Sequence, residues 1–216
     1  MIRNIKILLI SILSISNFSC LSENRSTEDA ITNKNRPNIL ILLTDDQSFN
    51  TINALGNKEI STPNIDKLVS NGFTFTHAYI MGSFSGAVCM PSRAMLMTGQ
   101  YLQKLDKVQG AIGENIKTMP QLLKESGYTT FFTGKWHNRK ASFFKSFTNG
   151  ENIFMGGMSN HLKVPLYNFD PSGIYPEKNK FFKDKFSSVL FKEAAVNFLR
   201  EYDGIKPFFA CVSFTS

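Results

Sequence analysis

Residues 39–46 read Ile-Leu-Ile-Leu-Leu-Thr-Asp-Asp, an apolar run that ends in two adjacent acids. An uninterrupted apolar run of this length predicts a strand that is buried on both faces, as in a parallel sheet. Sheets of α/β proteins place their ligands at the carboxyl ends of such strands, where Asp45 and Asp46 would lie. Two neighbouring carboxylates repel each other unless a cation holds them, and their hard oxygens suit Ca²⁺ or Mg²⁺. The alternative for these two acids is a solvated turn or a helix cap.

Other segments fit the same class, which is an α/β fold with a mostly parallel central sheet flanked by helices. Further strands are predicted over residues 128–133 and 206–214, which are rich in aromatic and β-branched residues. Helices are predicted over residues 118–127 and 184–202, the second with its apolar residues on one side. The remaining predictions are a helix that begins at Pro63, a strand over residues 73–79 and loops over residues 141–175.

Residues 87–100 read Ala-Val-Cys-Met-Pro-Ser-Arg-Ala-Met-Leu-Met-Thr-Gly-Gln and predict a helix with a cysteine at its start. Pro91 fits the first helical turn, where its missing N–H costs nothing, and Gly99 is suited to end the helix. Cys89 therefore lies at or just before the helix N-terminus. Free N–H groups and the positive end of the helix dipole favour an anion there. The alternative is a buried structural cysteine at a helix cap.

Three motifs resemble those of the type I sulfatases, the formylglycine-dependent members of the alkaline phosphatase superfamily. Residues 89–93, Cys-Met-Pro-Ser-Arg, match the C-x-P-S-R signature. The opening run over residues 37–47 and Gly-Lys-Trp-His over residues 134–137 also look like segments of this family. The resemblance covers residues 37–216, roughly the N-terminal half of such a catalytic domain. It implies the alkaline phosphatase-like sulfatase fold, incomplete in this chain.

The resemblance also implies the chemistry. Cys89 would be oxidised to formylglycine, an aldehyde whose hydrate is the nucleophile. Asp45, Asp46 and the converted Cys89 would bind Ca²⁺, with Mg²⁺ as the alternative metal. Two carboxylates cannot supply the six or more oxygens that Ca²⁺ prefers, so we expect an incomplete metal site. The other implied site residues are Arg93 and Lys135, which stabilise the sulfate charge, and His137, which hydrogen-bonds the formylglycine hydroxyl.

The implied function is hydrolysis of a sulfate ester in a small molecule or glycan. It requires a formylglycine-generating or sulfatase-maturating enzyme that acts on Cys89. One alternative is a phosphonate or phosphodiester hydrolase of the same superfamily, since some of these share C-x-P-S-R. Another is an inactive, truncated fragment with an exposed sheet edge that binds sulfated glycan or fails to fold. The net charge of +7 would also suit nucleic acid, but no motif supports that reading.

The first 36 residues predict export and attachment rather than catalysis. Residues 1–20 form an export signal, in which a basic start precedes an apolar run too short to anchor in a bilayer. Cys20 follows a small residue and resembles a lipoprotein cleavage site; a plain secretory signal is the alternative. Residues 21–36 are polar and aperiodic and predict a disordered tether. We therefore expect a bacterial protein of the periplasm, or an outer-membrane lipoprotein attached through lipidated Cys20.

The remaining cysteine and histidine candidates are predicted mainly to have structural roles. Cys211 lies in an apolar strand pattern and is predicted to be a small core residue, so the exported chain would not rely on disulfides. His77 is predicted to be structural, because nothing in its surroundings marks it as catalytic. His161 and Lys163 have two readings, contact with substrate or a satisfied role on the surface, and the second is favoured.

Overall fold

The computed structural model describes residues 36–107 and 109–215. The predicted export signal, Cys20 and all but the last residue of the predicted tether lie outside the described residues. Within the described part of the chain, no helix combines the length and the apolar character that are needed to span a bilayer.

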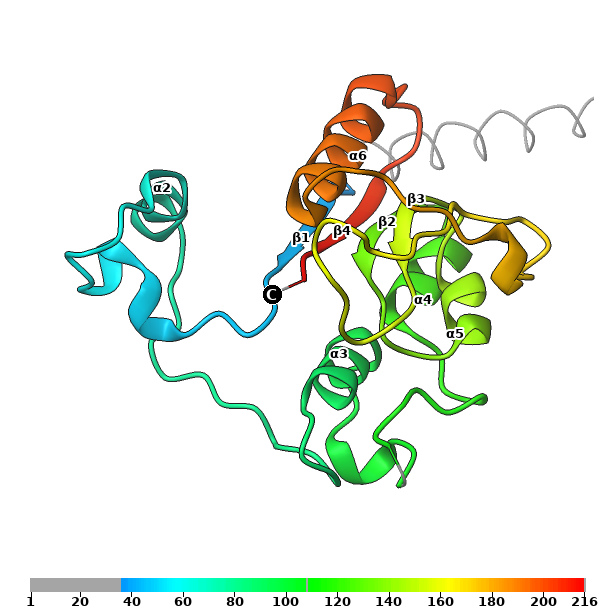
Figure 1. Cartoon of the computed structure of the whole chain (residues 1–216), viewed down its shortest axis with the longest axis horizontal. Helices are drawn as coiled ribbons and strands as arrows, with labels where there is room; N and C mark the ends of the chain where they lie inside the picture. Colours follow the sequence, from blue (N-terminus) through cyan, green and yellow to red (C-terminus); the bar gives the residue numbers. More distant parts are fainter. Residues whose placement is uncertain (1–35, 108, 216) are drawn as a thin grey trace, which may run out of the picture. The chain divides into compact units, whose positions relative to one another are not determined.

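Four strands form one sheet in the order β1-β4-β2-β3, and each neighbouring pair runs parallel (Figure 1). The parallel direction agrees with the continuous apolar runs from which the sheet was predicted. The strands are β1 (Ile39–Leu43), β2 (Thr129–Lys135), β3 (Asn149–Phe154) and β4 (Phe208–Ser213). Three of them lie in predicted strand segments, whereas β3 was not predicted.

The central strand β4 and the edge strand β1 differ in burial. Every residue of β4 is buried, because β1 and β2 pair with its two sides. β1 lies at an edge, and its side chains Leu40 and Leu42 are 46% and 54% exposed. β1 is thus an edge strand, as the expected exposed edge requires, but the prediction that it is buried on both faces is wrong. Alternate side chains of a strand point to opposite faces, and the face that carries Leu40 and Leu42 stays uncovered among the described residues.

Helices cover both faces of the sheet, and alternate residues of β2 meet them. Phe131 stacks on Phe198 of α6 with ring centroids 4.3 Å apart. The next residue, Phe132, points to the opposite face and packs against Phe143 and Phe147. Figure 1 shows α6 on one side of the strands and α4 and α5 on the other. The helices are α2 (Pro63–Asn71), α3 (Cys89–Thr98), α4 (Met119–Glu125), α5 (Lys140–Ser146) and α6 (Ser187–Glu201), with short 3₁₀ turns η1 (Phe49–Thr51), η2 (Asn53–Leu55), η3 (Leu102–Lys104) and η4 (Glu177–Asn179).

The helix ends follow the predicted capping residues. The Thr118 hydroxyl accepts a hydrogen bond from the Gln121 amide at 3.1 Å, which caps the start of α4. Gly99 ends α3 with φ of 64°, a left-handed conformation that favours glycine. α2 begins at Pro63 as predicted. These three boundaries therefore agree with the local residues from which they were predicted.

Two predictions of secondary structure are wrong. Residues 73–79 form neither strand nor helix, and Phe73 and Phe75 are 101% and 85% exposed. Alternation stabilises a strand only when a neighbouring strand pairs with its backbone, and these residues pair with none of the four described strands. The segment 141–175 is not all loop, because it contains most of α5 and all of β3. Burial of Phe143, Phe147 and Ile153 in the core outweighs the Gly and Asn content of that segment.

Candidate active site

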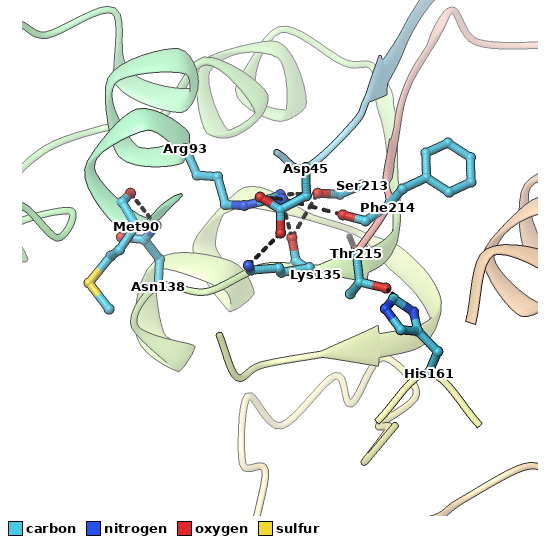
Figure 2. Close-up of polar contacts among 9 residues, drawn as sticks. All are labelled: Asp45, Met90, Arg93, Lys135, Asn138, His161, Ser213, Phe214 and Thr215. Atoms are coloured by element: carbon cyan, nitrogen blue, oxygen red, sulfur yellow. Dashed lines mark hydrogen bonds and ion pairs between the residues drawn. The ribbon is translucent and has the colours of Figure 1, made fainter. Parts of the chain in front are cut away.

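The carboxyl ends of three parallel strands meet at one rim of the sheet. Asp45 follows β1 by two residues, Lys135 ends β2 and Ser213 ends β4. Arg93 comes from the second turn of α3 and points to the same place. Figure 2 shows these four side chains converging. The predicted juxtaposition at a sheet rim is what this topology produces.

The centre of the rim is a buried group of one anion and two cations. Lys135 Nζ lies 2.5 Å from Asp45 Oδ2, and Arg93 Nη2 lies 3.6 Å from Asp45 Oδ1. The side chains of Lys135, Arg93 and Asp45 are 2%, 5% and 7% exposed. Charges this deeply buried are stable only when they are paired and hydrogen-bonded. The group carries one net positive charge when all three side chains are ionised.

Arg93 is held by the ends of two strands. Its Nη1 donates to the carbonyl oxygen of Lys135 at 2.9 Å and also to Ser213 Oγ. Its Nη2 donates to the carbonyl oxygen of Phe214 at 3.3 Å, and Ser213 Oγ donates to the Lys135 carbonyl at 2.7 Å. The guanidinium is therefore fixed as a planar fork between β2 and β4. Ser213 and Phe214 were not predicted as site residues, although both lie at the end of the strand predicted over residues 206–214.

The ionisation of the group follows from its contacts. Burial by itself would raise the pKa of the Asp45 carboxyl. The hydrogen bond from Lys135 and the charges of Arg93 and Lys135 outweigh burial, with a smaller contribution from a hydrogen bond with Cys89, and hold that pKa below its usual range. Burial lowers the pKa of Arg93 from its ordinary value, and the charge of Asp45 opposes that shift.

Cys89 is the first residue of α3, as predicted, and is half-buried. It lines a cleft of about 410 Å³ together with Asp45, Asp46 and Arg93. The Asn138 side chain fixes the first turn of the helix by donating from Nδ2 to the Met90 carbonyl at 3.3 Å (Figure 2). The structure therefore brings the thiol, Asp45 and Arg93 into one cleft at a helix N-terminus. Asn138 is a further residue that sequence reasoning missed, although it directly follows the Gly-Lys-Trp-His motif.

The two acids of the opening run have different surroundings. Asp46 is exposed, lines the same cleft and has φ of 55°. Both oxygens of Asp45 already lie close to cationic side chains. Among the described residues, no group of three His, Cys, Asp or Glu side chains is placed to hold a metal ion. The described donor set is therefore insufficient for Ca²⁺, and the predicted site at Asp45, Asp46 and Cys89 stays a prediction.

His137 lies beside the charged group of Asp45, Arg93 and Lys135 rather than inside it. Its φ is 49°, and its Nδ1 is buried with no hydrogen-bond partner among the described residues. Its Nε2 is packed against Gly157 so closely that an added Cβ there would lie 2.5 Å away. Burial, followed by the charges of Lys135 and Arg93, lowers the pKa of His137 to about 4, against a smaller opposing effect of Asp45. Within the described part of the chain, no hydrogen bond joins His137 to Cys89.

The lowered pKa of His137 predicts a loss of stability in mild acid. The unfolded imidazole has a pKa of about 6.5 and the folded one about 4. Between these values the unfolded chain binds a proton that the folded chain does not, so stability falls as the pH falls through this window. We expect His137→Gln to remove part of this slope in urea unfolding measured from pH 7 to pH 4. The exposed residue His77 provides the control variant His77→Gln; equal slopes in both variants would contradict the assignment.

Two further side chains have clear places in the structure. Cys211 is fully buried in β4, and burial raises its thiol pKa to about 12, so it is a core residue as predicted. Lys163 is exposed, whereas His161 is half-buried and hydrogen-bonded to Ser187. His161 thus has a satisfied hydrogen-bonding role at the surface rather than a demonstrated contact with substrate.

Comparisons with known proteins agree with the geometry. The family model described as Sulfatase matches residues 37–216. An N-acetylglucosamine-6-O-sulfatase of Bacteroides thetaiotaomicron is 29% identical over 205 residues, which is 93% of this chain and 33% of that protein. A solved structure in complex with its substrate D-glucosamine-2-N,6-O-disulfate is 26% identical, with a TM-score of 0.66, and the match covers 83% of this chain and 34% of the other. A sulfatase structure from Bacteroides fragilis, 21% identical over 83% of this chain and 43% of its own, has a TM-score of 0.69 and supports the fold alone. The chain thus spans about a third of the curated relative's length.

Proposed function

This chain belongs to the sulfatase family, and we propose that it carries the nucleophile end of an active site that hydrolyses sulfate esters of carbohydrates. The observation that carries the proposal is the cleft in which Cys89 opens α3 beside Asp45, Asp46 and Arg93. The choice of a sulfated carbohydrate rests on the relatives, one an N-acetylglucosamine-6-O-sulfatase and another bound to a glucosamine disulfate. The predicted family and α/β fold class are confirmed, and the activity is the proposal.

The chain's own residues prepare the cleft for an anion. Arg93 and Lys135 are fixed by buried contacts, so their charges need no reorganisation when a sulfate group arrives. The free N–H groups at the start of α3 add a partial positive charge beside Cys89. When Cys89 is converted to formylglycine, the aldehyde hydrate supplies the nucleophile.

We propose His137 as the proton-handling group. With a pKa of about 4 its imidazole is neutral near pH 7, so one ring nitrogen can donate a hydrogen bond while the other accepts one. A neutral imidazole can hold or move a proton, and His137 lies close enough to Lys135 and Arg93 for their charges to lower its pKa. The motif position supports this role, since the family resemblance gives the histidine of Gly-Lys-Trp-His to the formylglycine hydroxyl.

The proposal also covers the bound metal ion, the enzyme that modifies Cys89 and the location of the protein in the cell. Asp45 and Asp46 are proposed to contribute carboxylate oxygens to a divalent-cation site, with Ca²⁺ favoured over Mg²⁺, and further ligands would come from outside the described residues. A formylglycine-generating or sulfatase-maturating enzyme is the proposed partner that converts Cys89. Export through residues 1–20, with lipid on Cys20 and a place in the periplasm or outer membrane, rests on the sequence.

The test is co-expression of the chain with a formylglycine-generating enzyme. We expect mass spectrometry of the peptide that contains Cys89 to show conversion of the thiol to an aldehyde. Cys89→Ala should abolish this change, whereas Cys211→Ala should not, because that thiol is fully buried. Conversion of neither thiol would contradict the proposed role of Cys89.

Hydrolysis is then measured with Cys89 converted, in a protein that also supplies the metal ligands that the described residues lack. We expect sulfate release from N-acetylglucosamine 6-sulfate to exceed phosphate release from a phosphodiester, and to be lost in Cys89→Ala. Faster release of phosphate would favour the phosphodiester hydrolase. If this protein released neither product with Ca²⁺ supplied, the reading as a non-catalytic binding protein would replace the proposal.

A further inference from the structure

Three polar side chains form a small closed junction next to the site. His161 Nδ1 lies 2.8 Å from Ser187 Oγ and 3.3 Å from Thr215 Oγ1, and the two hydroxyl oxygens are 2.9 Å apart. Figure 2 shows the His161 ring facing Thr215 at the edge of the charged group. Each hydroxyl can both donate and accept, so either tautomer of His161 leaves each of the three groups with a hydrogen-bond partner.

The junction holds the His161 ring firmly. The imidazole stacks on Phe186, with ring centroids 5.0 Å apart and planes 13° from parallel. The backbone carbonyl of His161 accepts a hydrogen bond from the Ser187 amide at 2.9 Å. Ser187 is fully buried at the first position of α6. The ring is therefore anchored to a rigid helix by its nitrogen, its face and its own backbone.

Through these contacts the junction joins two elements that touch the site. His161 belongs to segment 155–163, and Gly157 of this segment packs against the His137 ring. Thr215 directly follows Phe214, whose carbonyl accepts from Arg93 at 3.3 Å and whose amide donates to the Leu43 carbonyl at 2.8 Å. The junction is thus close in the chain both to Gly157, which packs against His137, and to the Phe214 carbonyl, which accepts from Arg93.

We propose that His161 is a positioning residue of the active site: its Nδ1, through Ser187 and Thr215, holds segment 155–163 against His137 and keeps the end of β4 in place for Arg93. The importance of His161 for catalysis rests on the proposed function, whereas its contacts with Ser187 and Thr215 do not depend on that function. A residue with this role touches no substrate and acts through the order of its neighbours. Removal of Nδ1 from His161 should loosen the packing of Gly157 against His137 without unfolding the sheet.

The test is chemical footprinting of the chain's three histidines with diethylpyrocarbonate, which acylates accessible neutral imidazoles. Mass spectrometry gives a separate rate for each histidine-containing peptide. His77 is exposed and serves as the internal reference. His161→Phe keeps the ring that stacks on Phe186 but lacks Nδ1. We expect the His137 rate, relative to that of His77, to rise several-fold in this variant, because Gly157 no longer shields Nε2.

A second pair of variants separates positioning from general loosening. His161→Asn restores a polar atom near the position of Nδ1 and should return the His137 rate toward that of the wild type. Thr215→Val keeps the shape of the side chain, removes the hydroxyl and should raise the rate as His161→Phe does; it decides the matter if His161→Phe fails to fold. An unchanged His137 rate in Thr215→Val, or no rescue by His161→Asn, would overturn the proposal. The footprint needs no turnover, so it gives the same result in a Cys89→Ala background even if the proposed hydrolysis fails.

Discussion

Replacement of Gly134 by alanine is expected to destabilise the fold by roughly 4 kcal/mol, at the upper end of single-residue effects. Gly134 has φ of 99°, a conformation that side chains rarely adopt. An added Cβ would lie 1.8 Å from the backbone carbonyl oxygen of Ser213, its partner in β4. Both contributions are unfavourable: strained backbone costs about 1–3 kcal/mol, and overpacking against a rigid strand costs about as much again.

Urea unfolding followed by circular dichroism measures this loss. The matched control is Gly204→Ala, since Gly204 has φ of 75° but no atom within 4 Å of an added Cβ. We expect that control to lose only about 1–2 kcal/mol, from backbone strain without a clash. Equal losses in the two variants would show that the close approach of β2 and β4 is not tight. The close approach matters for the site, because it allows the Ser213 hydroxyl to donate to the Lys135 carbonyl at 2.7 Å.

Replacement of Lys135 by methionine should cost about 3 kcal/mol, the usual effect of removing one partner from a buried ion pair. Lys135 is 2% exposed and lies 2.5 Å from Asp45, which would be left with Arg93 as its nearest cation, at 3.6 Å. Methionine fills a similar volume, so the loss reports on charge rather than on packing. The control is Lys117→Met, which breaks an exposed pair with Glu125 at 2.7 Å. That change should cost far less than Lys135→Met, because exposed pairs contribute little.

The pH dependence of the Lys135→Met effect follows from Asp45. Its folded pKa is depressed, so the pairing stabilises the fold above the ordinary carboxyl pKa of about 3.9 and is lost as the pH falls through the folded pKa. Without Lys135, burial should raise the Asp45 pKa, so the variant protonates at a higher pH than the wild type. The cost of the substitution should therefore shrink as the pH falls from the Asp45 pKa of the variant towards the lower Asp45 pKa of the wild type. A cost independent of pH would mean that the ion pair is not its source.

Much of the fold could be predicted because local pattern and tertiary structure agree. The apolar runs became β1 and β4, and Thr118 and Gly99 cap the helices expected of them. The prediction failed where local pattern and packing disagree. Residues 73–79 alternate like a strand but pair with no described strand. β3 lies in a Gly- and Asn-containing stretch, and its buried residue Ile153 holds it in the core.

The sequence by itself determined the family, the parallel class of the sheet, and the placement of Cys89 at a helix start and of Asp45 and Lys135 at strand ends. These features depend on motifs and on periodicity along the chain, which no distant contact is needed to define. Only the tertiary structure decided that Asp45 rather than Asp46 meets the two cations, and that Arg93 is fixed by Ser213, 120 positions away. It also decided that His137 packs on Gly157 and that His161 joins Ser187 and Thr215. Burial and pKa are set by neighbours that the fold brings together from remote segments, so they cannot be read from the residues one at a time.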